Sequence, residues 1–458
     1  MIYGEKQEIG AKAYNLRLLS EKQIRIPKTT AISNDICAYL NELKLNGKKI
    51  NEICAIIEEK GFFSFEKQMH YPFIIRSSSI DEDNENASNA GKYLSIYNCT
   101  SRVDLISCIL KCWNSKNSED AMGVIIQEQL FPYCSGVAFI SELHGERNLV
   151  VEGIIGLGEL LVSGYVTPST YLYDHETDDF TLLHKTTQRV AEFPIKDPNL
   201  EPTDDLSIGD HPFRVMNLKK NVCYAICDYE HDYWDHSREI LLALKEECYK
   251  IYDSFGDSDI EWVYGEDRQL YIVQRRPITK RVNLDLNALE DKTARKNSGT
   301  TIVSGKAVGK LVSLDEYHGE EDVIVFATMF LPKDIIRLSG VRGILSVECS
   351  LLSHCSILAR EYGIPYWAGV EVSQFEKYKG HIVEVDFDKK KIKSVDPAKM
   401  GKKRKTTEVN FNKNLFDPIT LKCIPEAEKE NYILDEAVKS KIEKYYEEAF
   451  IKSIWGNI

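Results

Sequence analysis

A polar segment, KRVNLDLNALEDKTARKN at residues 280–297, separates two parts of the chain in which apolar residues recur regularly. The segment carries charges of both signs and little hydrophobic periodicity, which is typical of a linker. A chain of 458 residues is also too long for one hydrophobic core, so two or three domains are expected. We predict an N-terminal domain over residues 1–279, a linker over 280–303, a second domain over 304–396, and a basic connector with a helical tail over 397–458.

Hydrophobic patterns on both sides of this segment predict a mixture of strands and helices. The predicted strands of the first part lie at 72–79, 123–130, 135–141 and 147–156, and its predicted helices at 12–22, 33–44, 103–113 and 237–256. The last helix is expected to bury the face formed by Ile240, Leu244, Cys248 and Ile251, and to end at Gly256. From residue 304 the pattern indicates a β-rich unit with two or three helices. The fold class is therefore α+β or α/β, in several domains.

The composition argues against several classes of function. The net charge of -13 disfavours broad binding of nucleic acid or of an anionic membrane. No apolar stretch is long enough to span a bilayer, and the first residues, MIYGEKQEIG, lack the apolar core of a signal peptide. We therefore expect a cytoplasmic protein, in which the 12 cysteines are reduced thiols.

One group of these cysteines raises the question of a metal site. Cys223, Cys227, His231 and His236 lie in CYAICDYEHDYWDH, but their spacing does not fit the usual zinc sites. Cysteines on the buried side of a helix are the simpler interpretation.

An arginine followed by three hydroxyl side chains stands at the end of a predicted strand. In IIRSSSIDEDNENASNAGKY (74–93), Arg76 directly precedes three serines. A guanidinium fork with neighbouring hydroxyls suits a phosphate group. A loop stabilised by serine turns and a helix cap explains the same residues equally well.

A second group of polar residues lies on a predicted hairpin, DIEWVYGEDRQLYIVQRRPIT (259–279). Side chains alternate along a strand, so Gln274 and Arg276 should share a face of one strand, with Glu261 on the strand beside it. A carboxylate, an amide and a guanidinium on neighbouring strands can hold a metal ion and a polyphosphate. The alternative is a cross-strand ion pair on a surface hairpin.

These segments, in this order, resemble the ATP-binding domain of the phosphoenolpyruvate synthase, pyruvate phosphate dikinase and rifampin phosphotransferase family. IGAKAYNLRLL resembles the family's lysine motif and IIRSSSIDED its RSSATAED motif; ASNAGKY, SGVAFI, GLGELLVSGYVTP and DIEW…IVQRRPIT follow in family order. The resemblance implies an ATP-grasp-like nucleotide-binding domain that takes ATP and Mg²⁺. It assigns ATP binding to Lys12, Arg76, Glu261, Gln274 and Arg276, and the Mg²⁺ to Glu261.

The segment LLSHCSILAREYGIP (351–365) resembles the motif GG-x-x-SHxAIxARExGIP of the family's small swivelling phosphohistidine domain, of β/β/α type. The match places His354 on the phosphorylated histidine. Neutral imidazole is abundant near pH 7 and is a competent nucleophile toward phosphorus. The chain departs from the family pattern where Cys349 and Ser350 replace a glycine pair, and where Lys92 replaces a frequent glutamine.

The long acceptor-binding domain of those enzymes has no counterpart in this sequence, because neither the linker nor the tail has room for a barrel of about 250 residues. The resemblance implies a dikinase-type phosphotransferase that passes a phosphoryl group from ATP through His354 to an unidentified acceptor, leaving AMP and phosphate. The acceptor is expected to be a small molecule or part of a separate acceptor protein. A catalytic subunit that needs such a partner, and a non-catalytic nucleotide-binding regulatory module, stay open as alternatives. The oligomeric state is left undetermined.

Overall fold

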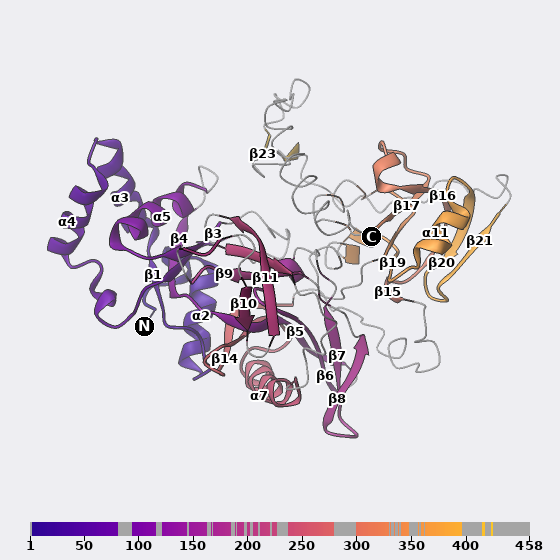
Figure 1. Ribbon diagram of the computed structural model, residues 1–458, viewed down its shortest axis with the longest axis horizontal. Coiled ribbons are helices and arrows are strands. Elements are labelled where there is room, and N and C mark those ends of the chain that lie inside the picture. Colours follow the sequence, from indigo (N-terminus) through magenta and orange to yellow (C-terminus); the bar gives the residue numbers. More distant parts are fainter. Residues whose placement is uncertain are drawn as a thin grey trace. The chain divides into compact units, whose positions relative to one another are not determined.

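The computed structural model (Figure 1) divides into two units, residues 1–400 and 401–458. The structure describes residues 2–80, 94–115, 121–143, 146–162, 166, 168–184, 188, 190–196, 199–201, 205–208, 211–219, 222–226, 237–278, 299–328, 330, 334, 338, 340–347, 356, 359–360, 362–395, 415–416 and 423–424. The described residues of the second unit form two paired strands, β22 (Leu415–Phe416) and β23 (Cys423–Ile424). The predicted segment 280–297 and nearly all of the predicted tail lie outside the described residues. The domain boundaries therefore stay predictions.

A four-stranded antiparallel sheet in the order β1-β4-β2-β3 forms one core with three helices. Its strands are β1 (Thr29–Ile32), β4 (Met122–Glu128), β2 (Phe73–Ser79) and β3 (Ser95–Cys99), and the helices are α3 (Asn34–Leu45), α4 (Ile50–Lys60) and α5 (Arg102–Asn114). A short 3₁₀ helix (Ser64–Lys67) precedes β2. Residues four apart, such as Ile53 and Ile57, give each helix an apolar stripe, which packs against Phe73 and Ile75 of β2. Arg76, which lies between Ile75 and Ser77 on β2, points to the opposite face of the sheet.

A six-stranded antiparallel sheet in the order β14-β13-β5-β6-β7-β8 forms the second core. Its strands are β14 (Leu270–Pro277), β13 (Ser258–Gly265), β5 (Pro132–Leu143), β6 (Glu146–Ile155), β7 (Ser169–Asp174) and β8 (Asp179–His184). The helices of this part are α1 (Lys6–Ile9), α2 (Ala11–Glu21), α6 (Glu159–Val162) and α7 (Ser237–Phe255). The predicted apolar face of α7 is confirmed: Ile240, Leu244, Cys248 and Ile251 are all buried. Gly256 ends this helix with φ +73°, as predicted.

A second four-stranded antiparallel sheet, in the order β10-β11-β12-β9, has its own small core. Its strands are β10 (Asp205–Ile208), β11 (His211–Lys219), β12 (Val222–Ile226) and β9 (Val190–Pro194). The expectation that Cys223 lies on a helix is wrong, because Cys223 pairs with Phe193 in the middle of β12. Its predicted burial is confirmed. Cys227, His231 and His236 lie outside the described residues.

A seven-stranded sheet in the order β15-β19-β18-β17-β16-β20-β21 follows along the chain. Its strands are β15 (Thr300–Val303), β19 (Tyr366–Ala368), β18 (Gly343–Ser346), β17 (Val323–Ala327), β16 (Lys306–Ser313), β20 (Ile382–Asp386) and β21 (Lys391–Ser394). The four strands from β16 to β19 are parallel, and α11 (Val372–Tyr378) packs on the sheet through Phe375, whose ring stacks on Phe326 at 3.9 Å. A short 3₁₀ helix (Leu314–Glu316) follows β16. The sheet begins at Thr300, inside the segment predicted as linker, because β15 pairs with β19.

These elements confirm the α+β or α/β multidomain fold class, and the strands and helices predicted for the first part agree within a few residues at their ends. Among the described residues, no helix combines the length and hydropathy that a membrane span requires.

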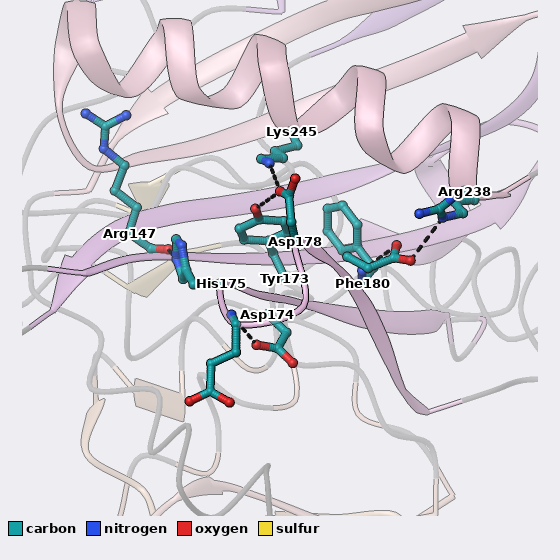
Figure 2. Close-up of polar contacts among 10 residues, drawn as sticks. Arg147, Tyr173, Asp174, His175, Asp178, Phe180, Arg238 and Lys245 are labelled. Carbon is teal, nitrogen blue, oxygen red and sulfur yellow. Dashed lines mark hydrogen bonds and ion pairs between the residues drawn. The ribbon is translucent and has the colours of Figure 1, made fainter.

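The turn between β7 and β8 is tied to α7 by charged side chains (Figure 2). Lys245 of α7 points toward the turn, where its Nζ donates to Asp178 Oδ1 at 2.6 Å, and Tyr173 donates to the same carboxylate. These two hydrogen bonds, that of Lys245 first, lower the pKa of Asp178. The ion pair is exposed on the Asp178 side, so its contribution to stability is small.

We predict that Asp178→Asn lowers the melting temperature by about 1–2 °C at pH 7. A depressed carboxyl pKa contributes stability above the unfolded-state pKa of about 4, and that contribution is lost as pH falls through the lower folded-state value. The difference between variant and wild type should therefore disappear on acidification to about pH 3, as measured by thermal unfolding across pH. Glu176→Gln is the control, since it removes an equal charge from the same turn, where Glu176 hydrogen bonds to Asp174 through its backbone N–H. A penalty for Asp178→Asn that persists in acid would contradict the assignment.

Candidate functional site

The hairpin of β13 and β14 brings three of the predicted site residues together. Glu261 and Gln274 are directly opposite each other in the register of these strands, and Asp259 is opposite Arg276. Nη2 of Arg276 lies 3.5 Å from Oε1 of Glu261. The intervening Arg275 points to the other face, where it donates to Ser258 Oγ and to the carbonyl of Phe255, both at 3.0 Å. The alternation predicted for this hairpin is thus confirmed.

Arg76 reaches the hairpin from a different sheet. Its Nη1 donates to the carbonyl of Val273 at 3.0 Å, and its Nη2 donates to Oε1 of Gln274 at 2.9 Å. Nη2 also lies 4.0 Å from Oε2 of Glu261. Arg76, Glu261, Gln274 and Arg276 therefore form one group, called here the Arg76 cluster. Glu261 stands between the two guanidinium groups, so the cross-strand ion pair considered from the sequence is present and is joined by an arginine from a second sheet.

Lys12 lies at the start of α2, the helix that packs against both β2 and β14. The backbone N–H of Ala13 donates to Ser78 Oγ at 3.0 Å, and Nδ2 of Asn15 donates to the carbonyl of Arg275 at 3.3 Å. These two bonds fix the first turn of α2 to the two strands that carry Arg76 and Arg276. Lys12 therefore lies on an element bound to both halves of the cluster.

Gly10 sets the position of that turn. Its backbone has φ +81° and ψ 170°, a region that is nearly restricted to glycine. A Cβ at this position would lie 1.8 Å from the carbonyl oxygen of Ser78. The close approach of α2 to β2 therefore requires a glycine here.

We predict that Gly10→Ala lowers the free energy of unfolding by about 3 kcal/mol or more, because backbone strain and a clash with a backbone atom act together. Gly61 is a matched control, since it also has positive φ (+68°) but has open space where a Cβ would go. Gly61→Ala should cost only about 1 kcal/mol. Denaturant unfolding of both variants checks this, and equal losses would show that the contact with Ser78 is unimportant.

Three carboxylates and a tyrosine near the cluster were not identified from the sequence. Asp259 precedes Glu261 by two residues on β13, and its Oδ2 lies 4.0 Å from Nη1 of Arg276. Period-two alternation could have predicted Asp259. Tyr97 of β3 interacts electrostatically with Arg76 and Glu261, and also with Glu159 and Glu192. Glu159 lies in α6, within the segment GLGELLVSGYVTP that resembles the family, and Glu192 lies in β9, a strand that the sequence did not predict.

The Arg76 cluster has the donors and acceptors that a nucleotide polyphosphate and its metal ion require. Two guanidinium groups suit phosphate oxygens. Among the residues that the structure describes, none hydrogen bonds to Nε2 of the buried Gln274, so this donor is available for a ligand. The carboxylates of Glu261 and Asp259 are ligands of the kind that Mg²⁺ takes, one or two at a time, together with phosphate oxygens. The residues present therefore fit ATP with Mg²⁺.

His354 lies outside the described residues, as do Lys92, Cys349 and Ser350. Its role stays a prediction from the motif.

Two parts of the chain match models of known protein families. Residues 48–297 match the family model of the pyruvate phosphate dikinase AMP/ATP-binding domain, and residues 319–390 match that of the PEP-utilising enzyme mobile domain. A probable phosphoenolpyruvate synthase of Archaeoglobus fulgidus is 27% identical over 346 residues, which are 69% of this chain and 42% of that protein. A probable phosphoenolpyruvate synthase of Methanothermobacter thermautotrophicus is 26% identical, over 68% of this chain and 45% of its own length.

A rifampicin phosphotransferase of Bacillus subtilis is 27% identical over 46% of this chain and 23% of its own length. The chain thus spans less than half the length of these curated relatives. The first family model covers more than half of the chain, with the mobile-domain match after it. The protein therefore belongs to the pyruvate phosphate dikinase and phosphoenolpyruvate synthase family, with an ATP-grasp-like AMP/ATP-binding domain followed by a PEP-utilising mobile domain.

Proposed function

We propose that this protein is a dikinase-type phosphotransferase that moves a phosphoryl group from ATP to His354 and from there to an acceptor. ATP, water and the acceptor would give AMP, inorganic phosphate and the phosphorylated acceptor. The observation that carries the proposal is the Arg76 cluster, in which residues of two sheets place guanidinium, amide and carboxylate groups together. Family membership supports the same reaction class.

The protein's own residues would act mainly by position and charge. Arg76 is already oriented by the carbonyl of Val273 and by Gln274, so its guanidinium binds phosphate without a large loss of side-chain freedom. Lys12 and Arg276 add positive charge, and Glu261 would hold Mg²⁺. Bound Mg²⁺ neutralises charge on the phosphate oxygens. The neutral imidazole of His354 would then form an N–P bond as a P–O bond of the nucleotide breaks.

We propose only the chemical class of the acceptor. The relatives are more than twice as long as the part that matches this chain. We propose either a small molecule or a separate acceptor protein, without nucleic acid or membrane. A cytoplasmic location stays a prediction from the sequence.

The proposal is tested by incubating the purified protein with Mg²⁺ and ATP and separating the nucleotides by chromatography. Without acceptor, the phosphoryl group stays on the protein, so we expect AMP formation to stop near one AMP per chain. Adding the true acceptor, or a cell extract that contains it, should restore continuous turnover. Tight ATP binding without any AMP, with or without extract, would overturn the proposal and favour a regulatory nucleotide-binding module.

A further inference from the structure

Tyr97 points to the face of its sheet that carries Arg76. In the register of β2 and β3, Ile75 is opposite Ile96 and Arg76 is opposite Ser95. Ile75 and Ile96 both pack into the core with α3, α4 and α5. Since side chains alternate along a strand, Ser95 and Tyr97 share the other face with Arg76.

A β-bulge at Tyr97 and Asn98 fixes the direction of this side chain. The pairing passes from Ile75↔Ile96 to Phe73↔Cys99, so that one residue of β2 is opposite two residues of β3. Asn98 has φ +54°, a conformation that asparagine tolerates better than most residues. Bulges of this kind redirect side chains beside functional sites.

Buried Gln129 holds the bulge with both ends of its amide. The backbone N–H of Asn98 donates to Gln129 Oε1 at 2.6 Å, and Gln129 Nε2 donates to Asn98 Oδ1 at 2.7 Å. Nδ2 of Asn98 donates in turn to the carbonyl of Ile195, which follows β9, at 2.7 Å. The bulge is therefore bound to the end of β4 in its own sheet and to the end of β9 in another sheet, and Tyr97 has a defined position.

The hydroxyl of Tyr97 is a neutral donor among charged groups. Burial, and then the negative charges of Glu159, Glu192 and Glu261, raise the pKa of Tyr97, while the charge of Arg76 acts in the opposite direction. The phenol is therefore protonated throughout the physiological range. Among the described residues, none forms a hydrogen bond with this hydroxyl. Tyr97 is partly buried, and an O–H donor beside the Arg76 cluster gains a hydrogen bond when a bound ligand supplies an acceptor.

We propose that the Tyr97 hydroxyl donates a hydrogen bond to a phosphate oxygen of bound ATP, and that the Gln129–Asn98 amide pair positions Tyr97 for this contact. The proposal rests on the proposed function, because it needs ATP at the Arg76 cluster. A neutral donor is suited to this position, because the nearby carboxylates of Glu159, Glu192 and Glu261 already repel the negative phosphates. Tyr97 is thus a binding residue and Gln129 a positioning residue.

The first test compares Tyr97→Phe with wild type by calorimetric titration with Mg²⁺ and ATP. Loss of one hydrogen bond to a charged acceptor should raise the Kd about tenfold. The ratio of the two Kd values should stay constant from about pH 6 to 9, because the hydroxyl remains protonated across that range. Unchanged affinity in Tyr97→Phe, or a ratio that varies with pH as a titrating phenol would, overturns the contact.

Tyr71→Phe is the matched control. Like Tyr97→Phe, it removes a partly buried hydroxyl near a carboxylate, since Tyr71 donates to Glu66 Oε1 at 2.6 Å. Unlike Tyr97, Tyr71 has no described contact with the Arg76 cluster. This variant should bind ATP like wild type. If wild type itself does not bind ATP, the proposed function fails and the Tyr97 contact fails with it. If wild type and Tyr71→Phe bind equally and Tyr97→Phe does too, only the Tyr97 contact fails.

Gln129→Leu tests the positioning role separately. It should weaken ATP binding several-fold, and the Gln129→Leu, Tyr97→Phe double variant should bind no more weakly than the weaker single variant. Such non-additivity is expected because both changes remove the same contact. Losses that add fully would contradict a positioning role for Gln129.

Discussion

Arg76→Ala is expected to weaken ATP binding by about 100-fold, the largest loss from any single change in the cluster. The variant loses the guanidinium that binds phosphate in the proposed site. It also leaves two acceptors, the carbonyl of Val273 and Oε1 of Gln274, without their donor. Gln274 would then have no hydrogen bond at either end of its amide among the described residues, so its orientation would be lost as well. The measurement is the Kd for ATP with Mg²⁺ by calorimetry.

Two further variants separate charge from geometry. Arg76→Lys keeps the charge, but one ammonium cannot reproduce the planar fork that serves Val273 and Gln274 together, so a loss of about tenfold is expected. Arg102 is a matched control, because it lies on α5 and forms ion pairs with Glu58 of α4 and Glu66 of the 3₁₀ helix before β2. Arg102→Ala should leave the Kd unchanged. Equal Kd values for Arg76→Ala and wild type would mean that ATP does not bind at this cluster.

His354→Ala is expected to abolish AMP formation while the Kd for ATP stays within about twofold of wild type. In the proposed reaction this imidazole is the nucleophile, and no other histidine lies in a matching motif. In the proposed site, nucleotide binding depends on residues of β2, β13 and β14, which the substitution does not change. The expected combination is intact binding with no turnover, measured by calorimetry and by nucleotide chromatography.

His381→Ala is the control for this prediction. His381 is exposed, and its backbone hydrogen bonds to Tyr378 and Leu311 do not depend on its side chain. The variant should form AMP at the wild-type rate. Persistent AMP formation in His354→Ala would show that the phosphoryl group reaches water or the acceptor without passing through this histidine.

The hairpin residues of the site could be predicted because strand alternation is a local property. Alternation along 270–277 places Gln274 and Arg276 on one face and Arg275 on the other, and the structure confirms this division. The same reasoning could have added Asp259, which lies two residues before Glu261. Local pattern is sufficient wherever both partners belong to one hairpin.

The contact between Arg76 and this hairpin could not be predicted, because it joins residues about 200 positions apart in the chain. It depends on how two sheets and α2 pack, which no local pattern records. Tyr97 was missed for a related reason: the bulge that directs it is held by Gln129 and by the carbonyl of Ile195, both distant in sequence. The strands from β9 to β12 were missed as well. Cys223 was assigned to a helix because it lies four residues before Cys227, a spacing of about one helical turn. The sequence does not show that Cys223 pairs with Phe193 of a neighbouring strand.

The charges of the cluster explain why ATP and its metal ion should bind together. Arg76 and Arg276 carry two positive charges, and Glu261 and Asp259 carry two negative charges, so the four side chains have no net charge. A polyphosphate with about four negative charges would meet carboxylates as well as guanidinium groups. We therefore expect ATP to bind far more weakly when Mg²⁺ is removed with a chelator.

The most direct test of the proposed reaction is the transfer of label from ATP to the protein. Wild-type protein and His354→Ala are incubated with Mg²⁺ and ATP carrying ³²P in both its β and γ phosphates, and the protein is then separated from nucleotide. We expect close to one labelled phosphoryl group per wild-type chain, lost in acid, kept in alkali and found in the peptide that contains His354. Wild-type protein that binds ATP but stays unlabelled, or label that persists in His354→Ala, would contradict it.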